Sequence, residues 1–387
     1  MSNDPVPTPT PYLDPQCVAF GEQAAKLSKG ASLSSLSLRE FRRLFRQFQT
    51  PTPKDPGISS SSFEVKTSFG DVKTFIVKPT DAEQDLPVIF YGKSTWNIRD
   101  TQLGLASASV VILYGMLTGG TVHGGGWFGG SEFDFESLLF DLVHRTGFAI
   151  VFPQYTLAPE EQFPAQQEQC LEVLQWVVKH GHTKGLKNDK FALAADSAGG
   201  QIVTAISILN HQRDLGLPIV HQILMFPFVN SVSLTSTFSQ FLFQDGPLIN
   251  IAFAAESFKD YYGDKIKERS SITASPILMT PAQAKEFMPS TTIVTAQNDF
   301  LRDQGEDFAK LLQTAGVDCG VVQGVAILHD AVVFNLSRTS PTVELIMIMV
   351  AGKLREVLTP GVGNDLSTNS HAEGEENGHS HKRKKRS

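Results

Sequence analysis

A serine stands between two runs of small residues at 191–200, where the sequence reads FALAADSAGG. The apolar residues before it predict a strand and the residues after it a helix, so Ser197 falls at a sharp turn. Small neighbours let strand and helix approach closely and present the hydroxyl as a nucleophile. The usual pattern is Gly-x-Ser-x-Gly; Gly199 and Gly200 fit it, but Ala195 replaces the first glycine. A serine that only caps the helix is the alternative.

Two further residues complete a triad in the chain order that such a turn requires, serine, then acid, then histidine. Asp299 comes just beyond a predicted strand at 291–296, and His329 follows the last predicted strand at 319–324. Asp299 could instead cap a helix, and His329 could be a surface histidine. Both nevertheless fall at strand C-terminal ends, where open α/β sheets build sites. The predicted chemistry is acyl transfer, in which Ser197 attacks, the histidine moves the proton and the aspartate orients the imidazole.

The stretch TVHGGGWFGG (121–130) offers bare backbone to a reacting oxygen. Glycines let N–H groups approach closely, and an oxyanion must be met by such donors. A phosphate loop would want a lysine after the glycines, and none is present; a plain turn is the third interpretation. The predicted oxyanion-hole donors are the backbone N–H groups of Gly124, Gly125 and Ala198. Trp127 and Phe128 come next, and they could line the substrate pocket or pack the loop against a cap.

Apolar runs separated by turn residues predict the elements that must position these groups. The predicted strands are 63–69 and 72–79 as a hairpin, then 86–91, 148–153, 191–195, 219–228, 291–296 and 319–324. Helical stretches fall between most of them, including one at 164–180 and a helical region at 12–50, while 50–62 reads as a loop. This alternation predicts an α/β fold with a mostly parallel sheet and helices on both faces. Residues 233–288 show no clear strand and predict a helical cap.

Composition sets the broad class. The chain has 387 residues, a hydrophobic share of 41% and a net charge of −7, so it can bury a sizeable core and shows no basic face for nucleic acid. The three cysteines suggest neither a disulfide framework nor a metal site; they are Cys17, Cys170 and Cys319.

The N-terminus lacks the pattern of a secretory signal, which favours a cytoplasmic protein. Residues 1–11 and 359–387 are predicted to be disordered around one domain at 12–358, and the basic end KRKKR (382–386) reads as a solvated terminus rather than a nuclear address.

Several motifs together carry a family resemblance. HGGGWFGG (123–130), YTLAPEEQFPA (155–165), DSAGG (196–200), DFLRDQGE (299–306) and LHD (328–330) resemble the hormone-sensitive-lipase-like branch of the α/β-hydrolases, and its fungal members in particular. The resemblance runs in order from about Tyr12 to Leu358. It implies an eight-stranded α/β-hydrolase core, a cap built from 12–50 and 233–288, and serine esterase chemistry without a cofactor. By matched position, it implies the same triad and the same oxyanion hole.

The implied activity is hydrolysis of a small-molecule ester with a short or medium acyl chain. A role in fungal secondary metabolism, trimming an acyl group from a metabolite, follows from the resemblance alone. A thioesterase, lactonase or deacetylase would use the same triad. A receptor-like or catalytically impaired member of the fold is a different class, although receptor-like members lose the histidine that stands here at 329. We expect no membrane span, no cofactor and no nucleic acid, and the chain could form a homodimer.

An unusual insertion at 92–121 departs from the family, in which the strand at 86–91 runs almost directly into the glycines. Residues 101–122 carry no charged side chain and could span a bilayer by length. A membrane helix would sever a core strand from its own catalytic loop, which argues against it. A lid loop is a second interpretation, although an apolar loop of this size is rare. The third is a translated intron, because Gly-Lys-Ser can be encoded across GTAAGT and Met-Leu-Thr across CTGAC. A message that keeps codons 93–120 in every copy contradicts the intron.

Overall fold

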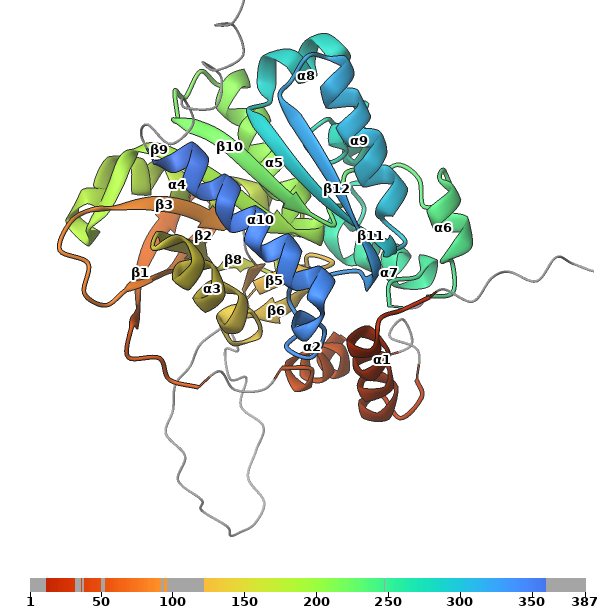
Figure 1. The fold of residues 1–387 in the computed structure, drawn as a ribbon. Coiled ribbons are helices and arrows are strands. Elements are labelled where there is room, and N and C mark those ends of the chain that lie inside the picture. The colour runs from red at the N-terminus through yellow and green to blue at the C-terminus, as the bar shows by residue number, and fades with distance from the viewer. Residues whose placement is uncertain are drawn as a thin grey trace, which may run out of the picture.

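The centre of the protein is an eight-stranded sheet. The computed structural model describes residues 12–31, 36, 38–49, 53–91, 94–95, 122–246 and 248–359. The strand order is β1-β2-β7-β3-β9-β10-β11-β12 (Figure 1). The pairs β1–β2 and β2–β7 are antiparallel, and all the other neighbouring strands pair parallel. The strands are β1 (Ile58–Thr67), β2 (Gly70–Pro79), β3 (Leu86–Tyr91), β7 (Ala149–Pro153), β9 (Leu186–Asp196), β10 (Ile219–Met225), β11 (Ser290–Asn298) and β12 (Cys319–Leu328).

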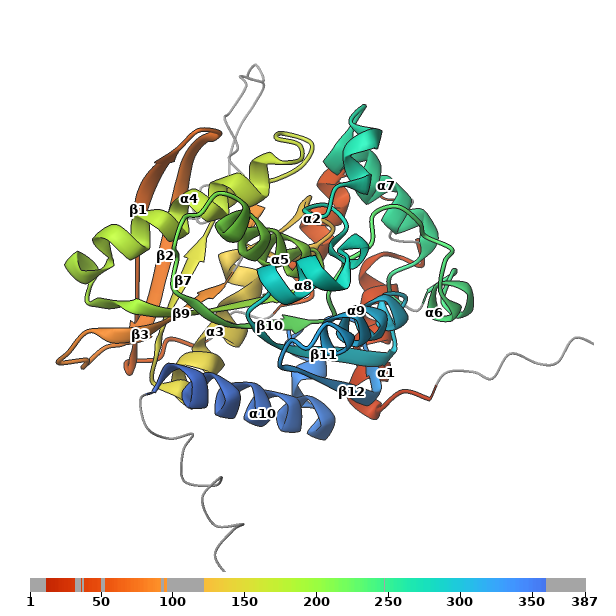
Figure 2. The same cartoon turned by 90° about the horizontal axis from the view of Figure 1, so that it is seen from above.

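Helices cover both faces of this sheet, as Figure 2 shows. One face carries α3 (Glu132–Thr146) and α10 (Pro341–Leu358); the other carries α4 (Ala165–His180), α5 (Ser197–Gln212) and α9 (Arg302–Thr314). The central strands are therefore buried over most of their length: every residue of β7 is buried, as are the last six residues of β9. The fold is the predicted α/β class with a mostly parallel sheet. In the parts of the chain that the structure describes, no helix is both long and apolar enough to cross a membrane.

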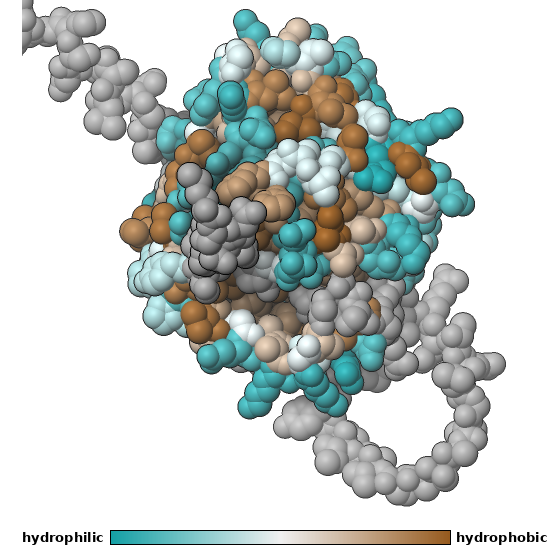
Figure 3. Space-filling view, turned by 90° about the vertical axis from the view of Figure 1, so that its right-hand side faces the viewer, coloured by the Kyte–Doolittle hydropathy of each residue, from teal (hydrophilic) through white to brown (hydrophobic). Residues whose placement is uncertain are grey.

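Further helices gather beside the sheet. They are α1 (Pro15–Leu27), α2 (Leu38–Gln47), α6 (Phe238–Leu242), α7 (Ile251–Tyr262) and α8 (Pro281–Phe287), with 3₁₀ turns η2 (Gly181–Lys184), η3 (Ile266–Ser270), η4 (Pro276–Leu278) and η5 (Ser337–Thr339). Phe41 of α2 contacts Phe253 of α7, with 5.3 Å between ring centroids. The two segments expected to form a cap thus meet, although the division into core and cap stays a prediction. The face in Figure 3 shows hydrophobic patches among polar residues, and α6 exposes Phe238 and Phe241.

Some predicted elements differ from the structure. The loop expected at 50–62 is wrong in its second half, because β1 begins at Ile58 and its four serines pair with β2. Serine suits this edge strand because most of these side chains face solvent. The helical region at 12–50 is two helices, and β9 begins five residues before the predicted start at 191. Residues 1–11 and 360–387 lie outside the described part of the chain. So does the insertion at 92–121, apart from the backbone of β4 (Ser94–Thr95), which pairs with β8 (Tyr155–Thr156).

Candidate active site

The predicted nucleophile lies at a strained turn. Ser197 is the first residue of α5 and directly follows β9, with a φ of +46°. A left-handed backbone is uncommon for residues other than glycine and gathers at functional sites. Gly200 must lack a side chain, because a Cβ there would meet the Cβ of Pro227 at 2.8 Å. Ala195 is fully buried within β9 opposite Leu224, so the sheet accommodates the extra methyl group that departs from the usual pattern.

Ser197, His329 and Asp299 form one hydrogen-bonded chain. Nε2 of His329 lies 2.8 Å from Oγ of Ser197, and its Nδ1 lies 2.8 Å from Oδ2 of Asp299. All three side chains are buried, and the second oxygen of Asp299 accepts from the N–H of Leu301 at 2.8 Å. Burial opposes a charged imidazole, but the negative charges of Asp299 and Asp330 outweigh it and raise the pKa of His329 to about 10.

The ends of β11 and β12 bring the acid and the base together. The two strands are parallel neighbours, and Asp299 and His329 each follow the last residue of their strand. The N-terminal segment ties both ends down: Asn298 donates its side-chain amide to the carbonyl of Tyr12, and the N–H of Asp14 donates to the carbonyl of Ala326, both at 2.9 Å. These contacts hold the two loops in place from outside the sheet.

The glycine stretch forms a small hairpin beside the nucleophile. It consists of β5 (Val122–Gly125) and β6 (Gly129–Ser131), and β5 lies against α5 and β9. Gly124 and Gly125 end β5, and the tip that follows has positive φ angles at Gly126 and Trp127, +60° and +66°. The predicted oxyanion-hole residues are thus adjacent to the helix that begins with Ser197.

Comparison with known proteins agrees with this geometry. Residues 121–333, more than half of the chain, match the profile of a family described as alpha/beta hydrolase fold. The chain belongs to the α/β-hydrolase family. An esterase of Gibberella moniliformis is 34% identical over 239 residues, 61% of this hydrolase and 73% of that protein. An esterase of Fusarium pseudograminearum is 30% identical over 311 residues, 79% and 86% of the two chains.

A solved structure extends the likeness to the fold. A thermostable esterase from Pseudomonas putida ECU1011 is 26% identical, with a TM-score of 0.77 over 90% of this chain and 99% of that one. The predicted resemblance to the hormone-sensitive-lipase-like branch is confirmed, and the hydrolase is a serine carboxylic ester hydrolase.

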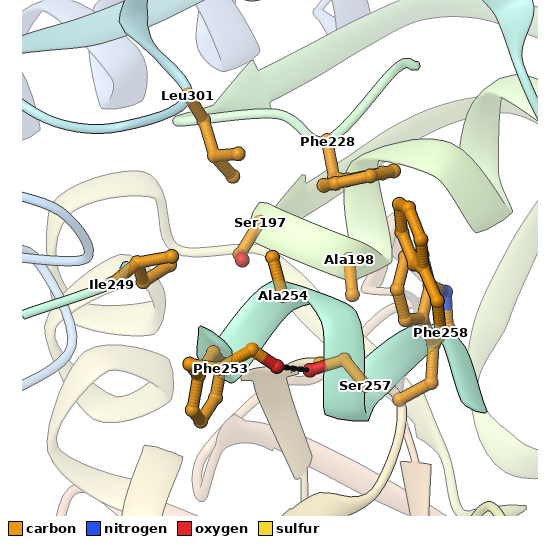
Figure 4. A pocket seen from close by; sticks show the side chains of 11 residues that line it. Ser197, Ala198, Phe228, Ile249, Phe253, Ala254, Ser257, Phe258 and Leu301 are labelled. Carbon is orange, nitrogen blue, oxygen red and sulfur yellow. Dashed lines mark hydrogen bonds between the residues drawn. The ribbon is translucent and has the colours of Figure 1, made fainter. Parts of the chain in front are cut away.

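A small pocket, partly open to solvent, lies in front of the nucleophile of this hydrolase (Figure 4). Its apolar wall consists of Trp127, Phe228, Ile249, Phe253, Phe258 and Leu301. Besides Ser197, the only polar side chain among the described residues that line it is Ser257, whose hydroxyl donates to the carbonyl of Phe253 at 2.8 Å, the dashed line in Figure 4. An apolar pocket with few polar groups suits the hydrocarbon part of an ester.

The two aromatic residues after the glycines have different places. Trp127 lines the pocket of the hydrolase, as the first interpretation had it. Phe128 packs between Phe41 of α2 and Phe253 of α7, with centroid distances of 5.1 and 5.5 Å. Its position therefore favours the alternative, in which the ring anchors the loop against the neighbouring helices.

Sequence reasoning missed a buried amide that joins these parts of the hydrolase. Oε1 of Gln201, one turn after the nucleophile, accepts from the indole N–H of Trp127 at 3.0 Å and from the hydroxyl of Tyr261 at 3.1 Å. Its amide group donates to Oε1 of Gln167 and to the carbonyl of Thr273. No local pattern marks such a residue, because its partners come from distant parts of the chain. Asp330 was missed as well, although it adjoins His329.

Proposed function

We propose that this hydrolase cleaves carboxylic esters of short or medium acyl chains through an acyl-enzyme on Ser197. The observation that carries the proposal is a pair of hydrogen bonds, each 2.8 Å long, which link Oγ of Ser197 to His329 and His329 to Asp299. Nothing else in the pocket offers a nucleophile beside a base among the described residues that line it. The arrangement has the roles of nucleophile, base and orienting acid in hydrogen-bond contact.

The reaction follows from these contacts. Oγ of Ser197 attacks the acyl carbon while its proton moves to Nε2 of His329. The imidazolium, stabilised by Asp299, returns that proton to the alcohol oxygen as the carbon–oxygen bond of the ester breaks. A water molecule then attacks the acyl-enzyme and gives its proton to the same nitrogen. Collapse of the second tetrahedral intermediate releases the carboxylic acid and restores the serine hydroxyl.

The backbone N–H groups of Gly124, Gly125 and Ala198 are the proposed donors to the tetrahedral oxygen. Ala198 lines the pocket next to the nucleophile, and β5 packs against the same helix. Loss of one such donor costs about 2.7–4 kcal/mol of transition-state stabilisation in a comparable enzyme. The short or medium acyl chain is proposed because large aromatic rings line the space before Ser197.

Other aspects of function rest on the resemblance. A role in the acyl chemistry of a secondary metabolite has only the family resemblance of the motifs as its support. The cytoplasmic location and the homodimer expected from the sequence stay predictions.

Hydrolysis of p-nitrophenyl acetate, butyrate and palmitate by the full chain tests the proposal beside Ser197→Ala. We expect turnover of the two short esters, little of the palmitate, and a loss of roughly 10⁴-fold or more in kcat for the variant. Ser207→Ala is a matched control. Ser207 is also buried on α5, but its hydroxyl donates to the carbonyl of Val203 and the residue does not line the pocket. Turnover that survives Ser197→Ala contradicts the proposal. A thioester or a lactone that is cleaved with a higher kcat/KM than any ester would change the bond type but keep the triad.

A further inference from the structure

A second carboxyl group lies against the imidazole of the triad. Oδ2 of Asp330 is 3.3 Å from Nε2 of His329, the nitrogen that faces Ser197, whereas Asp299 contacts Nδ1 on the other side of the ring. Asp330 is 3% exposed, and its Oδ1 has no hydrogen-bond partner within the described part of the chain. Ordinary triads place one carboxylate on the imidazole, on the nitrogen away from the nucleophile.

The backbone explains how the side chain reaches this position. Asp330 has a φ of +53°, a left-handed conformation that glycine, asparagine and aspartate adopt most readily. Backbone geometry alone would therefore be satisfied by glycine or asparagine. It does not account for a buried carboxyl group aimed at the base, because burial of such a group without full hydrogen bonding is unfavourable.

A proton held between Oδ2 of Asp330 and Nε2 of His329, which lie 3.3 Å apart, would have a direct effect on the reaction. If the proton is on the imidazole, Nε2 has no lone pair to accept the serine proton. If it is on the carboxyl group, the O–H donates to that lone pair and competes with Ser197. Both arrangements hold the same number of protons, so the pair titrates as a unit. Only removal of the shared proton leaves Nε2 free.

The charges around the pair determine how firmly that proton is held. Asp299 faces it from the turn after β11. Asp196, at the end of β9, is hydrogen bonded to the hydroxyl of Tyr91 on β3 at 2.7 Å. Arg338 of η5 donates to the carbonyl of Val332 and pairs with Asp141 of α3 at 2.8 Å, with 12% of its side chain exposed. Burial first, and then the charge of Asp299, raise the pKa of Asp330, while His329 opposes this. Releasing the proton would leave two carboxylates without a cation between them.

We propose that Asp330 is a positioning residue that retains a proton on the Nε2 side of His329 and thereby delays the appearance of the free base until higher pH. The inference rests on the proposed function, since it takes His329 to be the base. Its consequence is an esterase in which the acidic limb of the pH profile, where kcat/KM rises with pH, lies at higher pH than it would without the carboxyl group of Asp330. Asp330 acts through the imidazole and needs no contact with the substrate.

Asp330→Gly tests this, because glycine keeps the left-handed backbone and removes the carboxyl group; Asp330→Asn keeps the shape and removes the charge. We expect the acidic limb of the kcat/KM profile to move down by about one pH unit or more in both variants. Below the limb, kcat/KM would rise about tenfold over the unaltered enzyme for each unit of that shift. An unchanged limb in both variants overturns the proposal, whatever happens to kcat.

A second measurement separates this inference from the proposed function. The imidazole protons of His329 can be titrated by NMR in the Ser197→Ala chain, with and without Asp330→Gly. We expect the ring to lose its proton at lower pH when Asp330 is replaced. If the ring titrates at the same pH in both, Asp330 has no influence on it and the inference fails. If Ser197→Ala remains an active enzyme, the proposed function fails while this titration is still valid.

Discussion

The indole of Trp127 lies flat on the ring of Tyr261, with 4.3 Å between ring centroids and 5° between the planes. Both side chains donate hydrogen bonds to the same oxygen of Gln201. The left-handed backbone of Trp127 is a genuine outlier for a bulky residue and costs about 1–3 kcal/mol, so these contacts must hold it. One amide therefore joins the tip of the glycine loop, helix α7 and the helix of the nucleophile.

Gln201→Leu should loosen the glycine loop. The change leaves the indole N–H and the phenol O–H without a partner, and we expect the free energy of unfolding to fall by about 2–4 kcal/mol. Because the loop carries the proposed oxyanion donors, kcat should fall by about 10- to 100-fold with little change in KM. Urea unfolding and steady-state kinetics measure the two effects.

Gln169→Leu is the matched control for this change. Gln169 is equally buried, on α4, and bonds with Thr156 and with the carbonyl of Phe69 rather than with the loop. It should lose comparable stability but keep its kcat. A similar kcat for the two variants would show that Gln201 matters for stability alone.

Gly126→Ala should impair turnover by a steric effect. The new Cβ would lie 2.5 Å from Oγ of Ser257 and 2.9 Å from a ring carbon of Phe128, at a residue with a φ of +60°. The loop must shift to relieve these contacts, so we expect kcat to fall by about 100-fold. Gly147→Ala is the control, because its φ is +72° but nothing lies within 4 Å of the added carbon. It should cost about 1–2 kcal/mol of stability and leave kcat unchanged.

Adding Ser257→Ala to Gly126→Ala should restore part of the lost kcat, because it removes the nearer of the two clashing atoms. A double variant no faster than Gly126→Ala would mean that the backbone conformation, and not the clash, causes the defect.

Ile249→Ala should widen the acyl preference. Ile249 lines the pocket and is only partly buried, so its truncation enlarges the space before Ser197 without emptying the core. We expect the kcat/KM ratio of hexanoate to acetate esters to rise by about tenfold. Ile251→Ala is the control, since Ile251 is also partly buried but is not among the residues that line the pocket. An equal ratio in the two variants argues against a role of Ile249 in chain-length selection.

His221 should make the fold sensitive to acid. It is fully buried on β10, with Ser290 and Thr292 hydroxyls 3.0 Å from its two nitrogens, and burial, with a contribution from Lys353, lowers its pKa to about 4. Between about pH 6.5 and pH 4 the unfolded chain holds the proton and the folded chain does not, so stability falls as the pH falls through this window. The full effect is about 3 kcal/mol.

Urea unfolding of the natural chain and of His221→Gln at pH 7.5 and pH 4.5 measures this contribution. The natural chain should lose more free energy of unfolding between the two pH values than the variant does. An equal loss in both would mean that other groups cause the acid sensitivity.

The order of chemical groups along the chain was predictable, and the contacts across the fold were not. Ser197, Asp299 and His329 each follow an apolar strand, and strand ends of a parallel sheet meet at one edge, so the sequence indicated where they would gather. The structure places the three within hydrogen-bond distance. Nothing local in the sequence distinguished the Trp127–Tyr261 stack or the amide of Gln201, because their partners come from separate elements.

Asp330 shows a different limit. Its position beside His329 was visible, but which way its carboxyl group points depends on a left-handed backbone that the sequence does not reveal. The serines of β1 illustrate a second limit of prediction from sequence. Their polar run is typical of a loop, but in the structure it pairs with β2 and forms an edge strand. Periodicity reports burial, and an exposed strand has too little of it to be recognised.

The ties between the N-terminal segment and the ends of β11 and β12 have a consequence for synthesis on the ribosome. Tyr12 and Asp14 bond to Asn298 and Ala326, which are translated about three hundred residues later. At ordinary elongation rates this interval lasts roughly a quarter of a minute to a minute. Throughout it, Phe20 of α1 can contact Phe48, which follows soon after it, but lacks the ring of Phe334, on which it stacks with 4.4 Å between ring centroids. Helix α1 is therefore seated completely only after β11, β12 and the segment that carries Phe334 have been translated.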